Sequence, residues 1–222
     1  MGLPMQVALT VGPLACYFYL VGVWQSGRHP RVVAGPVDLA ILAFGVSGLV
    51  TVGPVGQVSM GLIFGAPGPV AWGLWLLFLV LWTAVFAGAA SRRVVVYNLE
   101  PGRLVQAVQE AAAALPGSKF AATLGGSEAT DDGRALHIEG IAALRVGTVD
   151  ARGREPEALI RALRPLLRDR LSRAPTGPTR VTWGLFALSW ATMLAPLAVF
   201  LFSEPKARAA LRALWLRISG RP

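Results

Sequence analysis

The sequence contains few of the residues that carry chemistry: one cysteine, two histidines and 12 carboxylates among 222 residues. The lone Cys16 has no partner within the chain, which excludes an intrachain disulfide. His29 and His137 are far apart in the sequence, and neither stands in the clustered spacing that a zinc or calcium site needs. Neither a Gly-x-Ser-x-Gly motif nor a phosphate-binding loop occurs. We therefore expect no metal ion and no cofactor.

Charged side chains are also scarce, at 15% of the chain, whereas an ordinary soluble domain has about a quarter. They are unevenly distributed: residues 1–27, 39–91 and 181–203 carry none, and 24 of the 33 lie between Arg92 and Arg180. This pattern excludes a disordered chain and a single soluble core. It predicts an integral membrane protein located in a cell membrane.

Four apolar stretches approach the length of a membrane-spanning helix, which is about 20 residues with a range of about 17–25. They are 7–24, 37–53, 70–90 and 181–203. The second is short, follows Pro36 and contains three glycines. It either crosses the membrane or re-enters it together with the apolar stretch 55–66.

The distribution of Lys and Arg around these stretches predicts the orientation. If the polar segment 91–180 faces the cytoplasm, that side holds eleven basic residues near the spans and the other side holds five. The count favours a cytoplasmic domain with both ends of the chain outside. Five positive charges on an external tail break the rule, and an odd number of spans would remove this conflict.

The segment 91–180 predicts a small soluble α/β domain. Arg93 to Asn98 is rich in β-branched residues, and further strands are expected at 120–124, 136–141 and 144–150, with a turn-rich tip at 125–133. Asn98 is expected to cap a helix that opens at Pro101, and a second helix is expected to open at Pro156. The fold class is thus an α-helical membrane protein of about four transmembrane helices with an inserted two-layer α+β domain.

The two helix openings resemble each other. The nine residues from Glu100 align without gaps on the nine from Glu155, with four identities, and each opening follows an expected strand. This favours two strand–helix units that share one sheet with both helices on one face, as in ferredoxin-like splits. Chance similarity between two Glu-Pro helix openings is the alternative.

Basic residues line two amphipathic stretches. Arg161, Arg164 and Arg168 recur along one side of the second domain helix, predicted opposite its leucines, either as a solvated face or as a contact with lipid phosphates. The tail 204–222 predicts a basic amphipathic helix lying on the membrane, with the contact residues Arg208, Arg212, Trp215 and Arg217. The expected partners are the bilayer with its anionic lipid head groups and a second membrane protein, but no nucleic acid.

Three functions remain open. The preferred hypothesis is a non-enzymatic membrane protein that presents the α/β domain as a subunit, scaffold or regulator. The alternative is a small transporter or channel component that uses Asp38 and the Gly-rich second span. The third is a membrane enzyme with scattered catalytic groups: Glu128, Asp131, Asp132, His137 and Glu139.

Overall fold

The computed structural model describes residues 3–53, 69–115, 122–123, 126–127, 134–203 and Ala209. The chain divides into two compact units. The first comprises Met1–Phe18, Phe44–Leu76 and Ala187–Pro222, and the second comprises Tyr19–Ala43 and Leu77–Phe186. Most of the expected tip 125–133 and the tail 204–222, apart from Ala209, lie outside the described residues.

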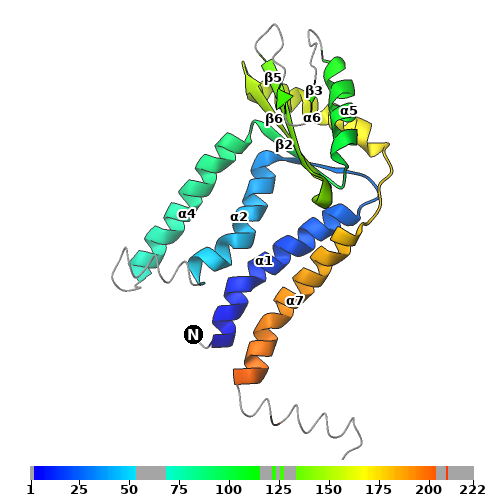
Figure 1. The fold of residues 1–222 in the computed structure, drawn as a ribbon. Coiled ribbons are helices and arrows are strands. Elements are labelled where there is room, and N and C mark those ends of the chain that lie inside the picture. Colours follow the sequence, from blue (N-terminus) through cyan, green and yellow to red (C-terminus); the bar gives the residue numbers. More distant parts are fainter. Residues whose placement is uncertain are drawn as a thin grey trace, which may run out of the picture. The chain divides into compact units, whose positions relative to one another are not determined.

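Within the described ranges, three helices are long and apolar enough to span a membrane (Figure 1): α1 (Leu3–Ser26), α4 (Pro69–Ala90) and α7 (Arg180–Ser203). Three of the four expected spans are therefore confirmed as long apolar helices. The remaining expected span, at 37–53, forms the helix α2 (Gly35–Thr51). Its 17 residues are at the lower limit of the spanning length. Within the first unit, the Ser189 hydroxyl donates to the Ala15 carbonyl at 2.9 Å, which fastens α7 to α1.

Four antiparallel strands form the central sheet in the order β1-β2-β6-β5. Their bounds are Arg31–Ala34 for β1, Arg93–Tyr97 for β2, Arg134–Ile141 for β5 and Val146–Gly153 for β6. A 3₁₀ turn, η1 (Ala142–Leu144), joins β5 to β6, and β3 (Ala122–Thr123) pairs with β4 (Gly126–Ser127) in a separate small sheet. Three of the sheet strands were expected, but β1 was not, because four residues are too few to show an alternating pattern.

The strand order supports the split arrangement expected from the repeated helix openings. Strand β2 leads into α5 (Pro101–Ala113) and β6 leads into α6 (Pro156–Ser172). Both β2 and β5 run antiparallel to β6, so β2 and β5 are parallel to each other with β6 between them. This is the split β-α-β of ferredoxin-like sheets. The difference is that β1, which occupies the edge beside β2, comes from before the domain segment rather than after its second helix.

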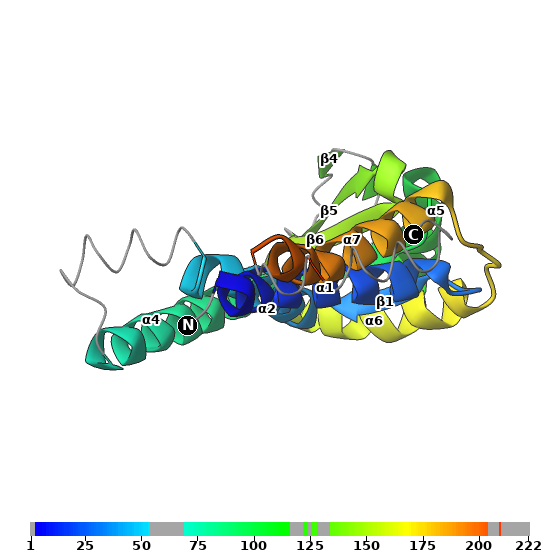
Figure 2. The same cartoon turned by 90° about the horizontal axis from the view of Figure 1, so that it is seen from below.

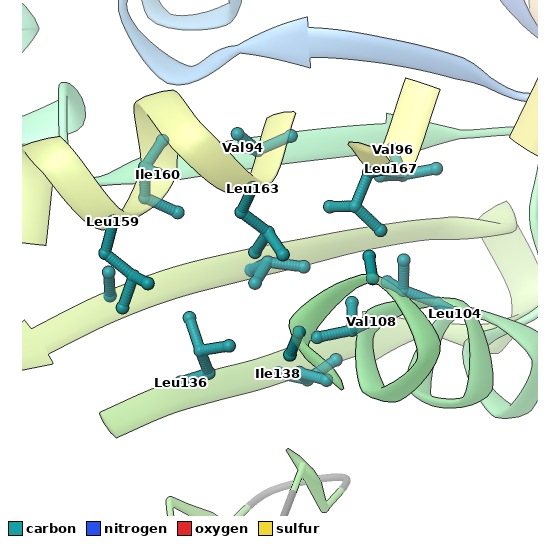
Figure 3. Packing of buried hydrophobic residues seen from close by; sticks show 14 of the residues in the cluster. Val94, Val96, Leu104, Val108, Leu136, Ile138, Leu159, Ile160, Leu163 and Leu167 are labelled. Carbon is teal, nitrogen blue, oxygen red and sulfur yellow. The ribbon is translucent and has the colours of Figure 1, made fainter. Parts of the chain in front are cut away.

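Both domain helices cover the same face of the sheet, as expected. Figure 3 shows Leu104 and Val108 of α5 and Leu163 and Leu167 of α6 meeting side chains of β2 and β5. These side chains are Val94, Val96, Leu136 and Ile138. All are almost completely buried, so this layer is the hydrophobic core of the domain.

Helices α5 and α6 begin at the residues predicted from the sequence, but the predicted N-cap of α5 is not the observed one. Both helices begin at a proline, Pro101 and Pro156, whose fixed φ and missing N–H suit the first turn. The expected cap by Asn98 is wrong, because Glu100 occupies the N-cap position of α5 and the Asn98 side chain bonds to a distant segment instead.

Helix α5 lies unusually close to β6 at Gly147. A Cβ atom added there would stand 2.2 Å from Cδ2 of the fully buried Leu104. We expect Gly147→Ala to destabilise the domain by about 1–3 kcal/mol, because the core cannot accommodate the methyl group without shifting. Thermal unfolding of the full chain in detergent measures this effect. Gly102→Ala is the matched control: nothing lies within 4 Å of a Cβ at Gly102 in α5, so the methyl group is expected to be neutral or stabilising.

Candidate functional site

The end of α1 packs against the sheet face opposite to the domain helices. The Trp24 ring lies 5.1 Å from the Tyr97 ring of β2, measured between centroids. The Arg31 guanidinium lies 5.8 Å from the centre of the Trp24 ring, which is a cation–π distance. The Tyr97 hydroxyl donates to the Asp38 carboxylate in the first turn of α2. The sheet is thereby tied to the ends of two apolar helices.

Polar contacts add two more ties. The Asn98 amide donates to the Gly27 carbonyl at 3.0 Å and to the Thr176 hydroxyl at 2.9 Å, so it joins the residue after α1 to the segment before α7. The Gln25 amide donates to the Leu144 carbonyl at 2.9 Å. Asn98 and Gln25 are only 1% and 2% exposed, so these bonds are shielded from water. We call this region, formed by Gln25, Gly27, Asn98 and Thr176, the junction between the helix ends and the domain; its residues are packed and hydrogen-bonded.

A cleft of about 470 Å³ opens between α6 and the starts of β2 and α2. Its polar lining consists of Ser91, Arg93, Glu157, Arg161, Arg164 and Arg168, and its apolar lining consists of Ala34, Pro36, Val94, Ile160 and Pro165. Figure 2 shows β1 and α6 side by side at this edge of the domain. The volume lies within the range of about 300–1,000 Å³ that is typical of small-molecule sites.

A close backbone approach shapes one wall of this cleft. A Cβ atom at Gly35 would stand 2.2 Å from the Ala90 carbonyl oxygen and 2.4 Å from Cγ of Arg93. Glycine is therefore required where α2 begins, because any side chain would separate α2 from the turn that joins α4 to β2. The cleft thus lies where two apolar helices, α2 and α4, meet the domain.

Positive charge dominates the lining of the cleft. Among the described residues, no carboxylate lies within ion-pair distance of Arg93, Arg161, Arg164 or Arg168. Glu157, the one carboxylate among the described lining residues, accepts a hydrogen bond from the Ser91 hydroxyl at 2.7 Å. The arginines are exposed to solvent, so they remain available to an incoming anion.

The structure corrects the expected position of the arginine stripe on α6. Side chains advance by about 100° per residue along a helix, so Arg161, Arg164 and Arg168 flank the buried face marked by Ile160 and Leu167. They border the cleft beside β1 instead of pointing directly away from the leucines. The stripe is therefore part of a concave surface that sequence periodicity alone did not reveal.

A second, smaller cleft of about 280 Å³ lies beside the Asn98 junction. Asn98, Arg103, Arg145 and Thr176 contribute to its lining. The Asn98 Oδ1 atom is buried and has no hydrogen-bond partner among the described residues. Since the Asn98 amide nitrogen is already used at the junction, we interpret this cleft as part of the contact between α1 and the segment before α7.

The residues expected for the alternative functions are not gathered into one site by the described part of the chain. His137 Nε2 lies 2.9 Å from Oε1 of Glu139, both on β5. Glu128, Asp131 and Asp132 lie outside the described residues, as do the tail residues Arg208, Arg212, Trp215 and Arg217. The described ranges contain no group of three His, Cys, Asp or Glu side chains arranged to hold a metal ion.

Sequence reasoning identified three arginines of the cleft and missed the remaining polar groups. Ser91 and Arg93 follow directly after the apolar helix α4, and Glu157 is in the first turn of α6. Arg93 could have been found from the sequence, because it is a basic residue just after an apolar stretch of spanning length. No protein-family model, curated protein or solved structure matches this chain.

Proposed function

We propose that this protein is a four-span membrane protein that holds its α/β domain rigidly at the cytoplasmic membrane surface, as a subunit, scaffold or regulator of a membrane complex. The observation that carries the proposal is the pairing of β1 with β2, supported by the ties between the sheet and the helix ends. Together they make one platform from the ends of several apolar helices.

The strand pairing supports an even number of membrane crossings. Strand β1 begins shortly after α1 ends, and β2 begins shortly after α4 ends. Because β1 and β2 are hydrogen-bonded neighbours, the strands that follow α1 and α4 lie in one sheet. If both helices cross the bilayer, we infer that their C-terminal ends share one side of it. This arrangement then requires one further crossing between β1 and α4. This requirement favours the crossing alternative over the re-entrant one, so we propose that α2 is part of a crossing segment.

We propose that α7 makes the fourth crossing, which predicts that the two ends of this sequence face the same side of the membrane. The basic residues near the spans favour a cytoplasmic domain. A rigid junction suits a platform, because a partner that binds the domain is then held at a fixed height above the bilayer.

Cysteine labelling tests this topology. In a Cys16→Ser background, single cysteines are introduced as Gly2→Cys, Ala158→Cys and Arg221→Cys, and sealed vesicles are treated with a membrane-impermeant maleimide. We expect positions 2 and 221 to react from one side and position 158 from the other. Reaction of positions 2 and 221 from opposite sides would contradict the four-span arrangement.

Isolation from native membranes in mild detergent tests the role as a subunit. We expect a tagged chain to co-purify with a constant membrane partner, and Asp38→Asn to leave this unchanged, because an amide oxygen still accepts the Tyr97 hydroxyl. A chain that purifies alone, together with loss of solute transport in Asp38→Asn, would instead favour the transporter hypothesis.

A further inference from the structure

The cleft between α6 and the starts of α2 and β2 combines three properties of an anion site. It is concave, its lining arginines have no ion-pair partner among the described residues, and part of its lining is apolar. Guanidinium groups bind phosphate through two parallel N–H···O bonds, which makes arginine well suited to phosphate recognition. Among the apolar lining residues, Pro36 is half-buried and Pro165 is exposed, so they offer a surface for carbon atoms attached to that phosphate.

We propose that this cleft binds the phosphate-bearing head group of an anionic phospholipid. The inference rests on the proposed function in one respect: α2 begins and α4 ends at the cleft, so if they span the bilayer, the cleft lies at head-group level. Basic pockets at the ends of spanning helices on the cytoplasmic side are suited to such lipids.

The spacing of the arginines favours a lipid with two phosphates. Arg161 and Arg168 are seven residues apart on α6, which corresponds to about 10 Å along the helix axis. Arg164 lies between them on the same flank. A head group such as that of cardiolipin can therefore place one phosphate near each end of the row, whereas phosphatidylglycerol has a single phosphate to offer.

Lipid binding by the full chain tests the proposal. The protein is purified in an uncharged detergent, delipidated and titrated with cardiolipin, phosphatidylglycerol or phosphatidylcholine, and the bound lipid is counted by native mass spectrometry. We expect cardiolipin to bind more tightly than phosphatidylglycerol, and phosphatidylcholine to bind weakest. Equal binding of all three lipids would overturn the proposal.

Two variants of Arg161, Arg164 and Arg168 test whether these three arginines bind the lipid. The triple variant Arg161→Gln, Arg164→Gln, Arg168→Gln is expected to bind cardiolipin about 100-fold more weakly, because each basic residue near lipid phosphates contributes about fivefold. The variant with lysine at the same three positions keeps the charge but loses the paired hydrogen bonds, so about tenfold weaker binding is expected. Unchanged affinity of the lysine variant would overturn a built site in favour of diffuse attraction.

The matched control removes the same charge from elsewhere on the domain. Arg103, Arg152 and Arg154 are exposed and do not line the cleft. Replacing all three by Gln is expected to change cardiolipin affinity by no more than about threefold, since distant exposed charges are screened. A loss equal to that of the cleft variant would contradict the proposal. Circular dichroism verifies that each variant is folded.

Soluble competitors distinguish the lipid from a free phosphate compound. Inorganic phosphate and glycerol 3-phosphate are added to the cardiolipin complex, and we expect neither to displace the lipid at millimolar concentration. Displacement by either compound would overturn the lipid assignment in favour of a soluble phosphate ligand. Sedimentation of the chain with membranes in the same preparations tests the proposed function separately. A chain that sediments with membranes but shows no lipid preference would contradict the lipid site and leave the proposed function standing.

Discussion

Replacing Leu163 by alanine is expected to destabilise the α/β domain by about 2–5 kcal/mol, more than the methyl group added at Gly147. Leu163 is completely buried and lies in the middle of α6, where Figure 3 shows it facing the sheet. Its truncation removes apolar contacts and leaves a cavity that α5, α6 and the sheet cannot fill by relaxing.

Trypsin digestion of the full chain in detergent measures this loss, because the domain is rich in arginine and cleavage follows transient unfolding. A loss of 2 kcal/mol corresponds to roughly 30-fold faster cleavage of the domain. Leu163→Met is the matched control, since it conserves side-chain volume and is expected to cost less than about 1.5 kcal/mol. If alanine and methionine gave the same cleavage rate, the placement of Leu163 in the core would be wrong.

The second large effect is expected for Asn98→Ala, at about 2–5 kcal/mol. Asn98 has a φ of 63°, a left-handed conformation that costs alanine roughly 1–2 kcal/mol and that asparagine tolerates better. The substitution also removes the two hydrogen bonds to Gly27 and Thr176, and buried partners left without a donor cost about 1–3 kcal/mol.

The position of new cleavage sites tests this assignment. If Asn98 ties the segment before α7 to the end of α1, trypsin should cut Asn98→Ala preferentially after Arg173 and Arg180. Asn98→Gly separates the two contributions, because glycine adopts positive φ freely and loses only the hydrogen bonds. Glycine and alanine variants of equal stability would show that the backbone conformation contributes nothing.

Much of the fold could be predicted from local pattern. The absence of charge marked the three long helices, and the Glu-Pro openings marked the starts of α5 and α6. These features depend on residues close together in sequence, so a single chain is enough to find them. The capping role assigned to Asn98 failed because its side chain is recruited by Gly27 and Thr176, which are distant in sequence.

The candidate site was less predictable. The arginines of α6 were identified by their spacing, but their position beside β1 depends on a strand from another part of the chain. The four residues of β1 and the following Gly35 show no sequence pattern that would predict a strand or a cleft at this point. The close approach of Gly35 to the Ala90 carbonyl, beside the cleft, is likewise seen only in the tertiary structure.

The sequence by itself determined which segments are apolar, which are charged and where the domain helices begin, because hydrophobicity and proline geometry act over a few neighbouring residues. Tertiary structure alone decided that β1 pairs with β2, that the ends of α1 and α4 therefore meet at one sheet, and that three arginines border a cleft. These outcomes depend on hydrogen bonds and packing between residues far apart in the chain, which no local periodicity records.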